Sequence, residues 1–371
     1  MAPAGAPTPL LDRQQPVPQP RKGSLMLLRV IGGAIGAVIG IAAIRLAPSD
    51  LLPLWLIGFL AVEVLGVMLH ELGHLAAGKL AGFDFYQIVA GPFMMTRESA
   101  GYKLRFLPRR ILLSAGHTLM IPRTTKNLRR DFAIFAAGGP VVTALLFVPL
   151  LVIPWGPAAG CLLAANAVLA AFSWIPMSIG GSHTDGKVLL TLAGKNASSE
   201  RFAAILYVMA IDTRGAAPAE WPREVLARLA EHRPESEFRG EAAVLLAIHA
   251  LDSGDPAATA CALENVLANY TRLRPDLRRP FFAEAAFFQG VYRRNAALAA
   301  QWLEDARKIK GGVALKDWDA AALAAVALAQ GKNEEARQQL GRAIAFLDRQ
   351  PGARGSVLAA RRRLAAVHLG N

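Results

Sequence analysis

Residues 70–74 read His-Glu-Leu-Gly-His, which combines two metal-binding side chains with a carboxylate. On an α-helix, His70 and His74 are four residues apart and therefore lie on one face, one turn above the other. Two imidazoles in this arrangement can bind one zinc ion at about 2.0–2.1 Å. Glu71 lies beside them, where it can accept a proton from a zinc-bound water as that water attacks a carbonyl. The motif therefore predicts a site for zinc-dependent hydrolysis.

The apolar surroundings of the motif strengthen this interpretation. Residues 51–69, which come directly before it, contain a single charged side chain, Glu63. The HExxH pattern occurs by chance in many soluble helices, but ionisable side chains inside a membrane-spanning helix are rare and usually mark function. The alternative interpretation is that these polar side chains only pack against neighbouring helices. We expect the site to lie toward the cytoplasmic end of its helix.

A catalytic zinc needs a third protein ligand and one open coordination position. Asp185 is the first candidate, because it follows a helix that Pro176 ends. Non-helical backbone at membrane depth is tolerated where it lines a cavity or is buried in protein. Asp185 can therefore approach a metal from the side opposite the motif. His183 is the competing ligand, and a surface Asx turn is the alternative role for Asp185.

Two further ionisable residues are weaker candidates for that ligand. Glu63 precedes His70 by seven residues, which on a helix separates them by about 10 Å along the axis. It is therefore too far away to share the ion, and we assign it either to a proton path or to a buried polar contact. His117 lies in a basic segment and is interpreted as a residue of the membrane interface.

The composition predicts a membrane protein. The chain has 371 residues, of which 53% are hydrophobic, and its mean hydropathy is +0.32. Apolar runs cover residues 25–47, 51–69, 132–153 and 158–179, each long enough to cross a hydrocarbon core about 30 Å thick. We expect about four transmembrane helices; a signal peptide is the alternative for the first run, although no clear cleavage site follows it. The two cysteines fit neither a disulfide framework nor a cysteine zinc cluster.

The positive charge indicates an orientation. The net charge is +13, and many of the basic residues lie between residues 97 and 130. Positively charged loops stay in the cytoplasm, so we place this segment and both termini there. We expect an integral protein of a prokaryotic cytoplasmic membrane, in contact with the lipid bilayer and without a nucleic-acid partner. The pattern of residues 93–106 predicts a membrane-surface β-hairpin that presents an edge strand to an extended substrate. For residues 111–122 we expect a short interfacial helix.

The chain divides into three predicted regions. Residues 1–23 contain six prolines and are interpreted as a disordered tail, and residues 24–195 as the transmembrane zinc metalloprotease domain. Residues 196–371 are alanine-rich and predict an all-α helical-repeat domain in the cytoplasm. Aligning Gly254, Arg294 and Gly331 places a leucine nine residues later in each case, at Leu263, Leu303 and Leu340. These units resemble tetratricopeptide repeats, whose stacked helix pairs bind partner proteins.

Three sequence elements together resemble the site-2 protease family of intramembrane zinc metalloproteases. They are "HELGH", "AAGGP" at residues 136–140 and "SHTDG" at residues 182–186, in the order and spacing of that family's three-helix core. The resemblance implies that His70, His74 and Asp185 bind Zn²⁺ and that Glu71 is the catalytic base. It also implies a substrate that is a membrane-spanning or membrane-anchored protein.

The chain departs from the family pattern at two residues, and its interval from Pro176 to Asp185 is also longer than usual. Thr143 and Ser173 stand where that family commonly has asparagines, which are thought to hold the substrate backbone. Asn166, about two turns before Ser173, is a possible replacement. The intact motif favours an intramembrane zinc metalloprotease, because a scaffold has no need for Glu71. The alternatives are a catalytically silent membrane scaffold whose repeats bind a partner, and a hydrolase of soluble peptides with an open vestibule.

The third ligand can be identified by mutation. We expect Asp185→Ala to lose bound zinc, as His70→Ala and His74→Ala do, because each change removes one of three ligands. Metal analysis of the purified protein measures this. If His183→Ala loses the metal while Asp185→Ala keeps it, His183 is the third ligand instead.

Overall fold

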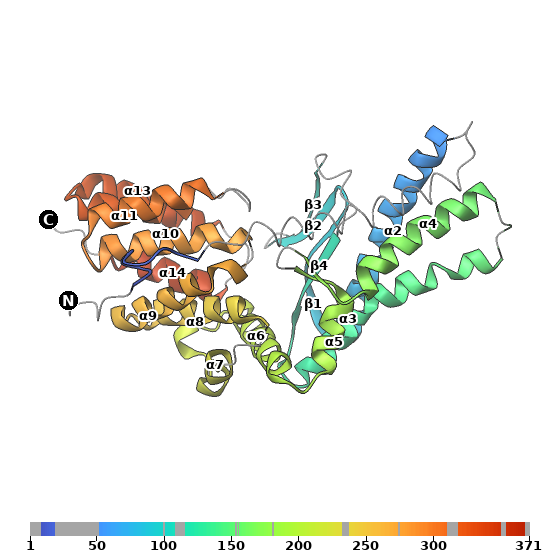
Figure 1. Ribbon diagram of the computed structural model, residues 1–371, viewed down its shortest axis with the longest axis horizontal. Coiled ribbons are helices and arrows are strands. Elements are labelled where there is room, and N and C mark those ends of the chain that lie inside the picture. The colour runs from blue at the N-terminus through green and yellow to red at the C-terminus, as the bar shows by residue number, and fades with distance from the viewer. Residues whose placement is uncertain are drawn as a thin grey trace. The chain divides into compact units, whose positions relative to one another are not determined.

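The structure is a computed structural model. It describes residues 9–18, 52–98, 101–107, 116–152, 154, 156–179, 182–231, 237–273, 275–309, 318–349 and 354–367. These ranges contain thirteen α-helices, one four-stranded antiparallel sheet and one two-stranded hairpin. The chain forms two compact units (Figure 1). We call Arg21–Lys195 the site unit, and Met1–Pro20 together with Asn196–Asn371 the repeat unit.

The site unit combines apolar helices with the sheet. Its helices are α2 (Leu52–Leu80), α3 (Leu128–Leu145), the 3₁₀ helix η3 (Val148–Leu151), α4 (Pro157–Trp174) and α5 (Asp185–Ala193). Its strands are β1 (Phe83–Ala90), β2 (Phe93–Glu98), β3 (Gly101–Phe106), β4 (Gly116–Pro122), β5 (Ser178–Ile179) and β6 (Ser182–His183).

Helix α2 runs without a break from the apolar segment through the histidine motif, as predicted. It packs against α3, α4 and strand β1. The contact with α3 is close because glycines face each other: a Cβ on Gly73 would lie 2.5 Å from the carbonyl oxygen of Gly138. Small residues allow helix backbones to approach in this way. This approach brings α3 within hydrogen-bonding distance of the motif.

Two of the helical segments are long and apolar enough to cross a membrane, Leu52–Leu80 and Leu128–Leu151. The helix at Ala158–Trp174 is apolar but shorter. It ends sooner than the predicted run of residues 158–179, since Ile175 is extended and Pro176 follows it. The run of residues 25–47 lies outside the described residues. Transmembrane placement of all four runs remains a prediction.

The four-stranded sheet has the order β3-β2-β1-β4. Strands β2 and β3 form the predicted hairpin of residues 93–106, with Glu98 paired to Gly101 at the turn. The prediction of a helix at residues 111–122 is wrong where the structure describes it, because residues 116–122 form β4 and pair with β1 from Phe83↔Pro122 to Ala90↔Gly116. Pairing with β1, and not the local sequence pattern, therefore decides the conformation of residues 116–122.

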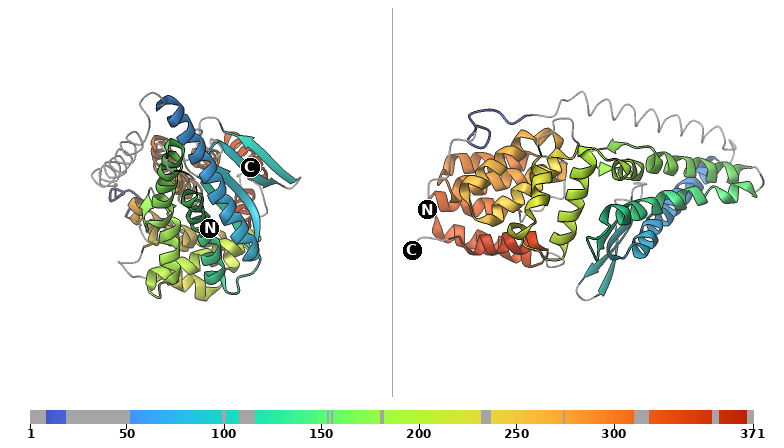
Figure 2. Two further views of the ribbon diagram at one scale, coloured as in Figure 1. Left: turned by 90° about the vertical axis from the view of Figure 1, so that its right-hand side faces the viewer. Right: turned by 90° about the horizontal axis from the view of Figure 1, so that it is seen from below.

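The repeat unit consists of paired antiparallel helices, which lie side by side in Figure 2. Its helices are α6 (Ala197–Thr213), α7 (Arg223–Ala230), α8 (Arg239–Ser253), α9 (Pro256–Ala268), α10 (Pro275–Val291), α11 (Ala296–Lys308), α12 (Trp318–Ala329), α13 (Asn333–Asp348) and α14 (Gly355–Ala365), with short 3₁₀ helices at Pro218–Glu220 and Tyr270–Arg272.

The three positions aligned as repeats occupy equivalent places. Gly254, Arg294 and Gly331 lie between the two helices of the pairs α8–α9, α10–α11 and α12–α13. All three have a left-handed backbone, with φ of 74°, 53° and 76°. The aligned leucines are buried on the second helix of each pair. The repeat inferred from the sequence is therefore one helix pair with a left-handed turn.

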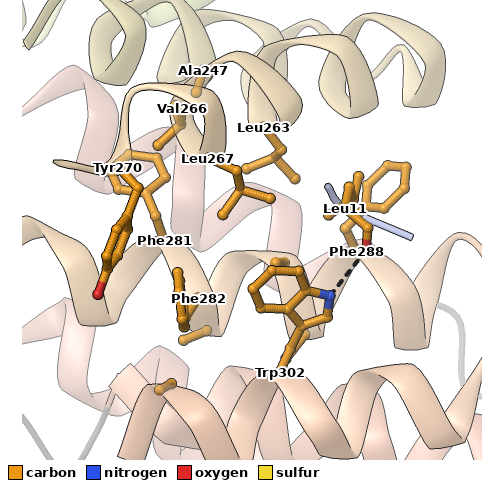
Figure 3. Close-up of a cluster of buried hydrophobic side chains, with 14 of the residues drawn as sticks. Leu11, Ala247, Leu263, Val266, Leu267, Tyr270, Phe281, Phe282, Phe288 and Trp302 are labelled. Atoms are coloured by element: carbon orange, nitrogen blue, oxygen red, sulfur yellow. Dashed lines mark hydrogen bonds between the residues drawn. The ribbon is translucent and has the colours of Figure 1, made fainter. Parts of the chain in front are cut away.

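Part of the N-terminal tail contradicts the prediction of disorder. Residues 9–18 pack against the repeat unit, and the Leu11 side chain is completely buried in its core. Figure 3 shows Leu11 beside Trp302, Phe288 and Leu263. The prediction relied on prolines and few apolar residues, but two adjacent leucines provide enough apolar surface to bury against helices already in place.

The left-handed turns can be tested with two glycines of α13 and its preceding turn. Gly331→Ala should lower the free energy of unfolding by about 1–2 kcal/mol, because a Cβ is unfavourable at positive φ. Gly341→Ala is the control: it lies inside α13, where an added Cβ contacts nothing within 4 Å, and should stabilise by about 0.5–1 kcal/mol. Unfolding followed by circular dichroism measures both. Equal effects in the two variants would contradict the assignment.

Candidate metal centre

Three predicted ligands converge in the site unit. The Asp185 carboxylate lies 3.1 Å from Nε2 of His70 and 3.3 Å from Nε2 of His74. The two Nε2 atoms are 3.2 Å apart. One ligand atom from each residue can be chosen so that all lie within 4.8 Å of one another. The cluster is formed by α2 and by the start of α5, and α3 packs against both of these helices (Figure 1).

The three polar residues of the histidine motif are buried. His70, Glu71 and His74 are each at most 6% exposed, although they lie on a helix with many exposed apolar residues. Burial without partners would be costly for these polar groups. The Asp185 side chain, which faces both imidazoles, is less buried and remains 24% exposed.

Asp185 reaches the histidines because the chain turns back after α4. Strands β5 and β6 form a short hairpin, and Thr184 caps α5 by accepting a hydrogen bond from the Lys187 N–H at 3.3 Å. Gly186 packs so tightly under the end of α4 that a Cβ would collide with the Trp174 carbonyl. At the other end of α5, the Arg129 guanidinium donates to the carbonyls of Leu192 and Gly194. Both ends of α5 are thus held in place.

Hydrogen bonds from α3 orient the two imidazoles. The Phe135 carbonyl lies 2.8 Å from Nδ1 of His74 and can only accept, so Nδ1 carries the proton. Thr143 donates its hydroxyl proton to the Gly139 carbonyl at 3.1 Å, so its oxygen accepts from Nδ1 of His70 at 2.8 Å. When the rings are neutral, both Nε2 atoms therefore carry lone pairs. This is the form in which histidine binds a metal.

The space between the ligands fits a cation. Two Nε2 lone pairs facing each other and a carboxylate repel one another unless a positive charge lies among them. Gly139 leaves this space open, since a Cβ there would lie 2.5 Å from Nε2 of His70 and would also collide with Nε2 of His74. Two nitrogen ligands and one carboxylate match a catalytic zinc site, which keeps a fourth position open.

Glu71 is held separately from the ligand set. The Thr118 hydroxyl on β4 lies 2.6 Å from one carboxylate oxygen of Glu71 and 3.1 Å from its backbone carbonyl. Gly116 lies against the same side chain, and a Cβ there would come within 2.5 Å of Oε1. The start of β4 therefore packs on the carboxylate. Glu71 is positioned by the sheet, and the ligands are positioned by α3 and α5.

The competing third ligand lies outside the cluster. Nδ1 of His183 on β6 is hydrogen-bonded to the Ser178 hydroxyl at 2.8 Å. His117 is exposed on β4, and Glu63 is buried on α2 without belonging to the cluster. This geometry agrees with the preference for Asp185 over His183 as the candidate third ligand.

The proposed replacement for the missing asparagines has another role. The Asn166 amide donates to the Leu146 carbonyl at 2.9 Å, which satisfies a backbone group at the C-terminal end of α3. Ser173 is buried near the end of α4, and its hydroxyl lies 3.4 Å from the Ala170 carbonyl of its own helix. Both residues therefore contribute to helix structure.

Sequence reasoning missed two contributors, Thr143 and Thr118. Thr143 was treated only as a departure from a family pattern, yet it is fully buried against His70. Its spacing from Gly139, one helical turn, was a usable signal. No pattern in the sequence links Thr118 to Glu71, because that contact depends on strand pairing.

Comparison with known proteins identifies no relative: no protein-family model, curated protein or solved structure matches this chain.

Two substitutions separate the effect of the Thr143 hydroxyl from the effect of the side-chain volume. Thr143→Val should weaken metal binding by roughly 10–100-fold, because the buried methyl group cannot accept the Nδ1 proton of His70. Thr143→Ser keeps the hydroxyl and should bind metal nearly as well as the wild type. Competition with a chelator measures both affinities. Equal affinities in the Val and Ser variants would show that the hydroxyl does not orient the ligand.

Proposed function

We propose that this chain is an intramembrane zinc metallopeptidase that hydrolyses peptide bonds of membrane-spanning or membrane-anchored proteins. The observation that supports this most strongly is the convergence of His70, His74 and Asp185 beside a separately held Glu71. A structural zinc site usually has four protein ligands, whereas three ligands leave one position for water. A carboxylate placed next to them, and hydrogen-bonded through a single threonine, is the additional group that hydrolysis requires.

Zinc is the ion that suits this donor set best. Histidine nitrogens together with one carboxylate are a common ligand set of catalytic zinc, whereas calcium and magnesium favour oxygen ligands. Bound zinc would supply a Lewis acid for the substrate carbonyl and lower the pKa of a bound water to about 7. The same ligands also suit other divalent transition metals, so metal analysis decides the identity of the ion.

Different residues of the chain bind the metal, transfer the proton and position the base. His70, His74 and Asp185 hold the ion and leave one side open. Glu71 accepts a proton from the attacking water at its carboxylate and later passes that proton to the leaving amine. Thr118 donates to one carboxylate oxygen of Glu71 at 2.6 Å. The other oxygen is then the proton acceptor, and the carboxylate cannot rotate away from the ligands.

A membrane location is supported by the apolar surface of the site unit. Large apolar side chains are exposed along α2, α3 and α4, among them Leu54, Ile57, Leu65, Leu145 and Phe172. A soluble protein rarely exposes so much contiguous apolar surface. Lipid contact would satisfy these side chains, while the ionisable groups face the interior of the unit, as expected for functional residues in membrane helices.

The position of residues 9–18 constrains the topology. They pack within the repeat unit together with residues 196–371, so both lie on one side of any membrane the chain crosses. The number of crossings between residues 18 and 196 is then even. Helix α2, Leu128–Leu151 and α4 account for three, and the apolar run of residues 25–47 is our candidate for the fourth. The basic segment supports the cytoplasm as this common side.

This topology is consistent with the position of the site. His70 and His74 lie in the C-terminal half of α2, and Asp185 follows the C-terminal end of α4. With four crossings, both of these helix ends lie on the cytoplasmic side. The sheet connects α2 to α3 on that same side. The site is therefore placed near the cytoplasmic surface, within reach of a substrate helix that unwinds there.

We further propose that the substrate adds to the open edge of β4. The predicted hairpin of residues 93–106 does present an edge strand, but that strand is β3, because β2 is paired with both β1 and β3. Among the described strands, β3 and β4 form the two edges of the sheet, and β4 is the one that contacts Glu71. A peptide must be extended for cleavage, and strand addition satisfies the backbone groups that unwinding exposes.

A proline scan tests this edge. Along β4, the N–H groups of alternate residues point to opposite sides, so proline at alternate positions of 117–120 should slow cleavage with zinc occupancy unchanged. The same scan along residues 102–105 of β3, the far edge, should leave the cleavage rate unchanged. Slower cleavage from the β3 variants alone would place the substrate at the other edge.

The catalytic role of Glu71 is the decisive test of the proposal. Glu71→Gln should retain zinc but cleave a model transmembrane substrate roughly 10²–10⁴-fold more slowly, because an amide cannot accept the proton. Asp84→Asn is the control, a carboxylate on β1 that is paired with Arg123, and it should retain both zinc and activity. Rates are measured in detergent or reconstituted vesicles. A wild-type protein that binds zinc but cleaves nothing would favour the scaffold.

A further inference from the structure

The N-terminal segment is bound to the repeat unit through its main chain. The Glu264 carboxylate accepts hydrogen bonds from the backbone N–H groups of Leu10 and Leu11, both at 2.8 Å. The Leu11 carbonyl accepts from the Trp302 indole and from the Gln289 amide, each at 3.0 Å. Three side chains from α9, α10 and α11 thus bind consecutive peptide groups of one residue pair. Figure 3 shows the hydrogen bond between Trp302 and Leu11.

The side chains of the segment add sequence selectivity. Leu11 is completely buried, and Asp12 accepts from the Gln289 amide at 2.9 Å. Arg13 is 2.7 Å from Asp305 and lies over the Trp302 ring, 3.9 Å from its centroid. Beyond Arg13, the side chains of residues 14–16 are exposed. The contacts therefore select for two leucines followed by an acidic and a basic residue.

The groups that bind the segment are polar and are buried beneath it. With the segment in place, Gln289 and Trp302 are at most 1% exposed, and each directs a polar hydrogen to it. If the segment left, water or another peptide would have to supply these acceptors, because donors without an acceptor are unfavourable. A solenoid helix face that binds only its own chain for packing would be expected to use apolar side chains here. Polar groups that bind a main chain are typical of a peptide-binding site.

We propose that the face formed by α9, α10 and α11 is an exchangeable peptide-binding site for a Leu-Leu-Asp-Arg sequence, which residues 9–18 occupy in cis. The partner that this site fits is a protein segment with the same chemistry, two apolar residues followed by an acidic and a basic one. Cis occupancy makes the segment a competitor of that partner, since a tethered ligand is present at a high effective concentration. The proposal does not depend on the chemistry of the metal centre.

The experiment uses the full chain with a protease site inserted after residue 20, purified in detergent. The probe is a fluorescent peptide with the sequence of residues 7–18. Before cleavage, the tethered segment should block binding, so the fluorescence anisotropy of the probe should remain low. After cleavage, the probe should exchange with the released segment and bind saturably, with one site per chain.

Two matched peptides test the selectivity. Leu11→Asp in the probe should weaken binding at least about tenfold, because it removes a fully buried apolar side chain. Gln14→Ala changes an exposed side chain and should bind like the original probe. Glu264→Gln in the protein should also weaken binding, because the amide cannot accept two backbone hydrogen bonds as a carboxylate does.

Three results would overturn the proposal. Equal binding before and after cleavage would mean that the probe uses another surface. A segment that neither dissociates nor exchanges after cleavage, in protein that remains helical, would make it a permanent part of the core. Equal affinity of the original and Leu11→Asp probes would remove the sequence selectivity.

Discussion

The close approach of α2 to α3 is the constraint on which the metal centre depends. The backbones meet at Gly73 and Gly138, where a Cβ on either residue would collide with the carbonyl of the other. This contact brings the Phe135 carbonyl and the Thr143 hydroxyl to the Nδ1 atoms of the two histidines, both at 2.8 Å. Hydrogen bonds tolerate only a few tenths of an ångström of extension. Larger side chains at this crossing would therefore leave the imidazoles without their orienting partners.

Two carboxylates in the same small volume have different partners. Asp185 faces two imidazoles, while Glu71 is bound by the Thr118 hydroxyl. A ligand carboxylate and a base carboxylate must stay distinct, because a base that bound the ion could no longer accept a proton from water. The sheet and the helices provide this separation, since β4 binds Glu71 and α5 carries Asp185. The Asp185 carboxylate and the two imidazoles form a cluster that could hold a metal ion.

In the repeat unit, too, polar side chains are directed at specific partners. Its helix pairs bury alanines and leucines between them, yet on α9, α10 and α11 it directs Glu264, Gln289 and Trp302 toward a segment from the start of the chain. The segment is separated in sequence from these groups by the entire site unit. A contact of such long range is made only if it compensates for the entropy of ordering the segment. Leu11, buried among aromatic and aliphatic side chains, contributes to that compensation.

The sequence alone determined the motif-bearing helix, the common face of His70 and His74, and the repeat positions. His70 and His74 could be placed on one face because helical spacing is a local property of the chain. Gly254, Arg294 and Gly331 could be aligned because each repeat makes the same local turn. Asp185 was ranked above His183 from the helix break at Pro176, which is also encoded locally.

The tertiary structure decided everything that depends on partners distant in sequence. Residues 116–122 form a strand only because β1 lies beside them, and Thr118 reaches Glu71 only through that pairing. Thr143 became a contributor to the site because α3 packs at a particular register on α2. The first leucines of the chain, which alone can bury little, are ordered because the helices of the repeat unit already form an apolar face with acceptors and donors for their main chain. A local sequence pattern predicts how residues are spaced along one element. The free energy of a long-range contact depends on two distant segments, and these segments meet only in the folded chain.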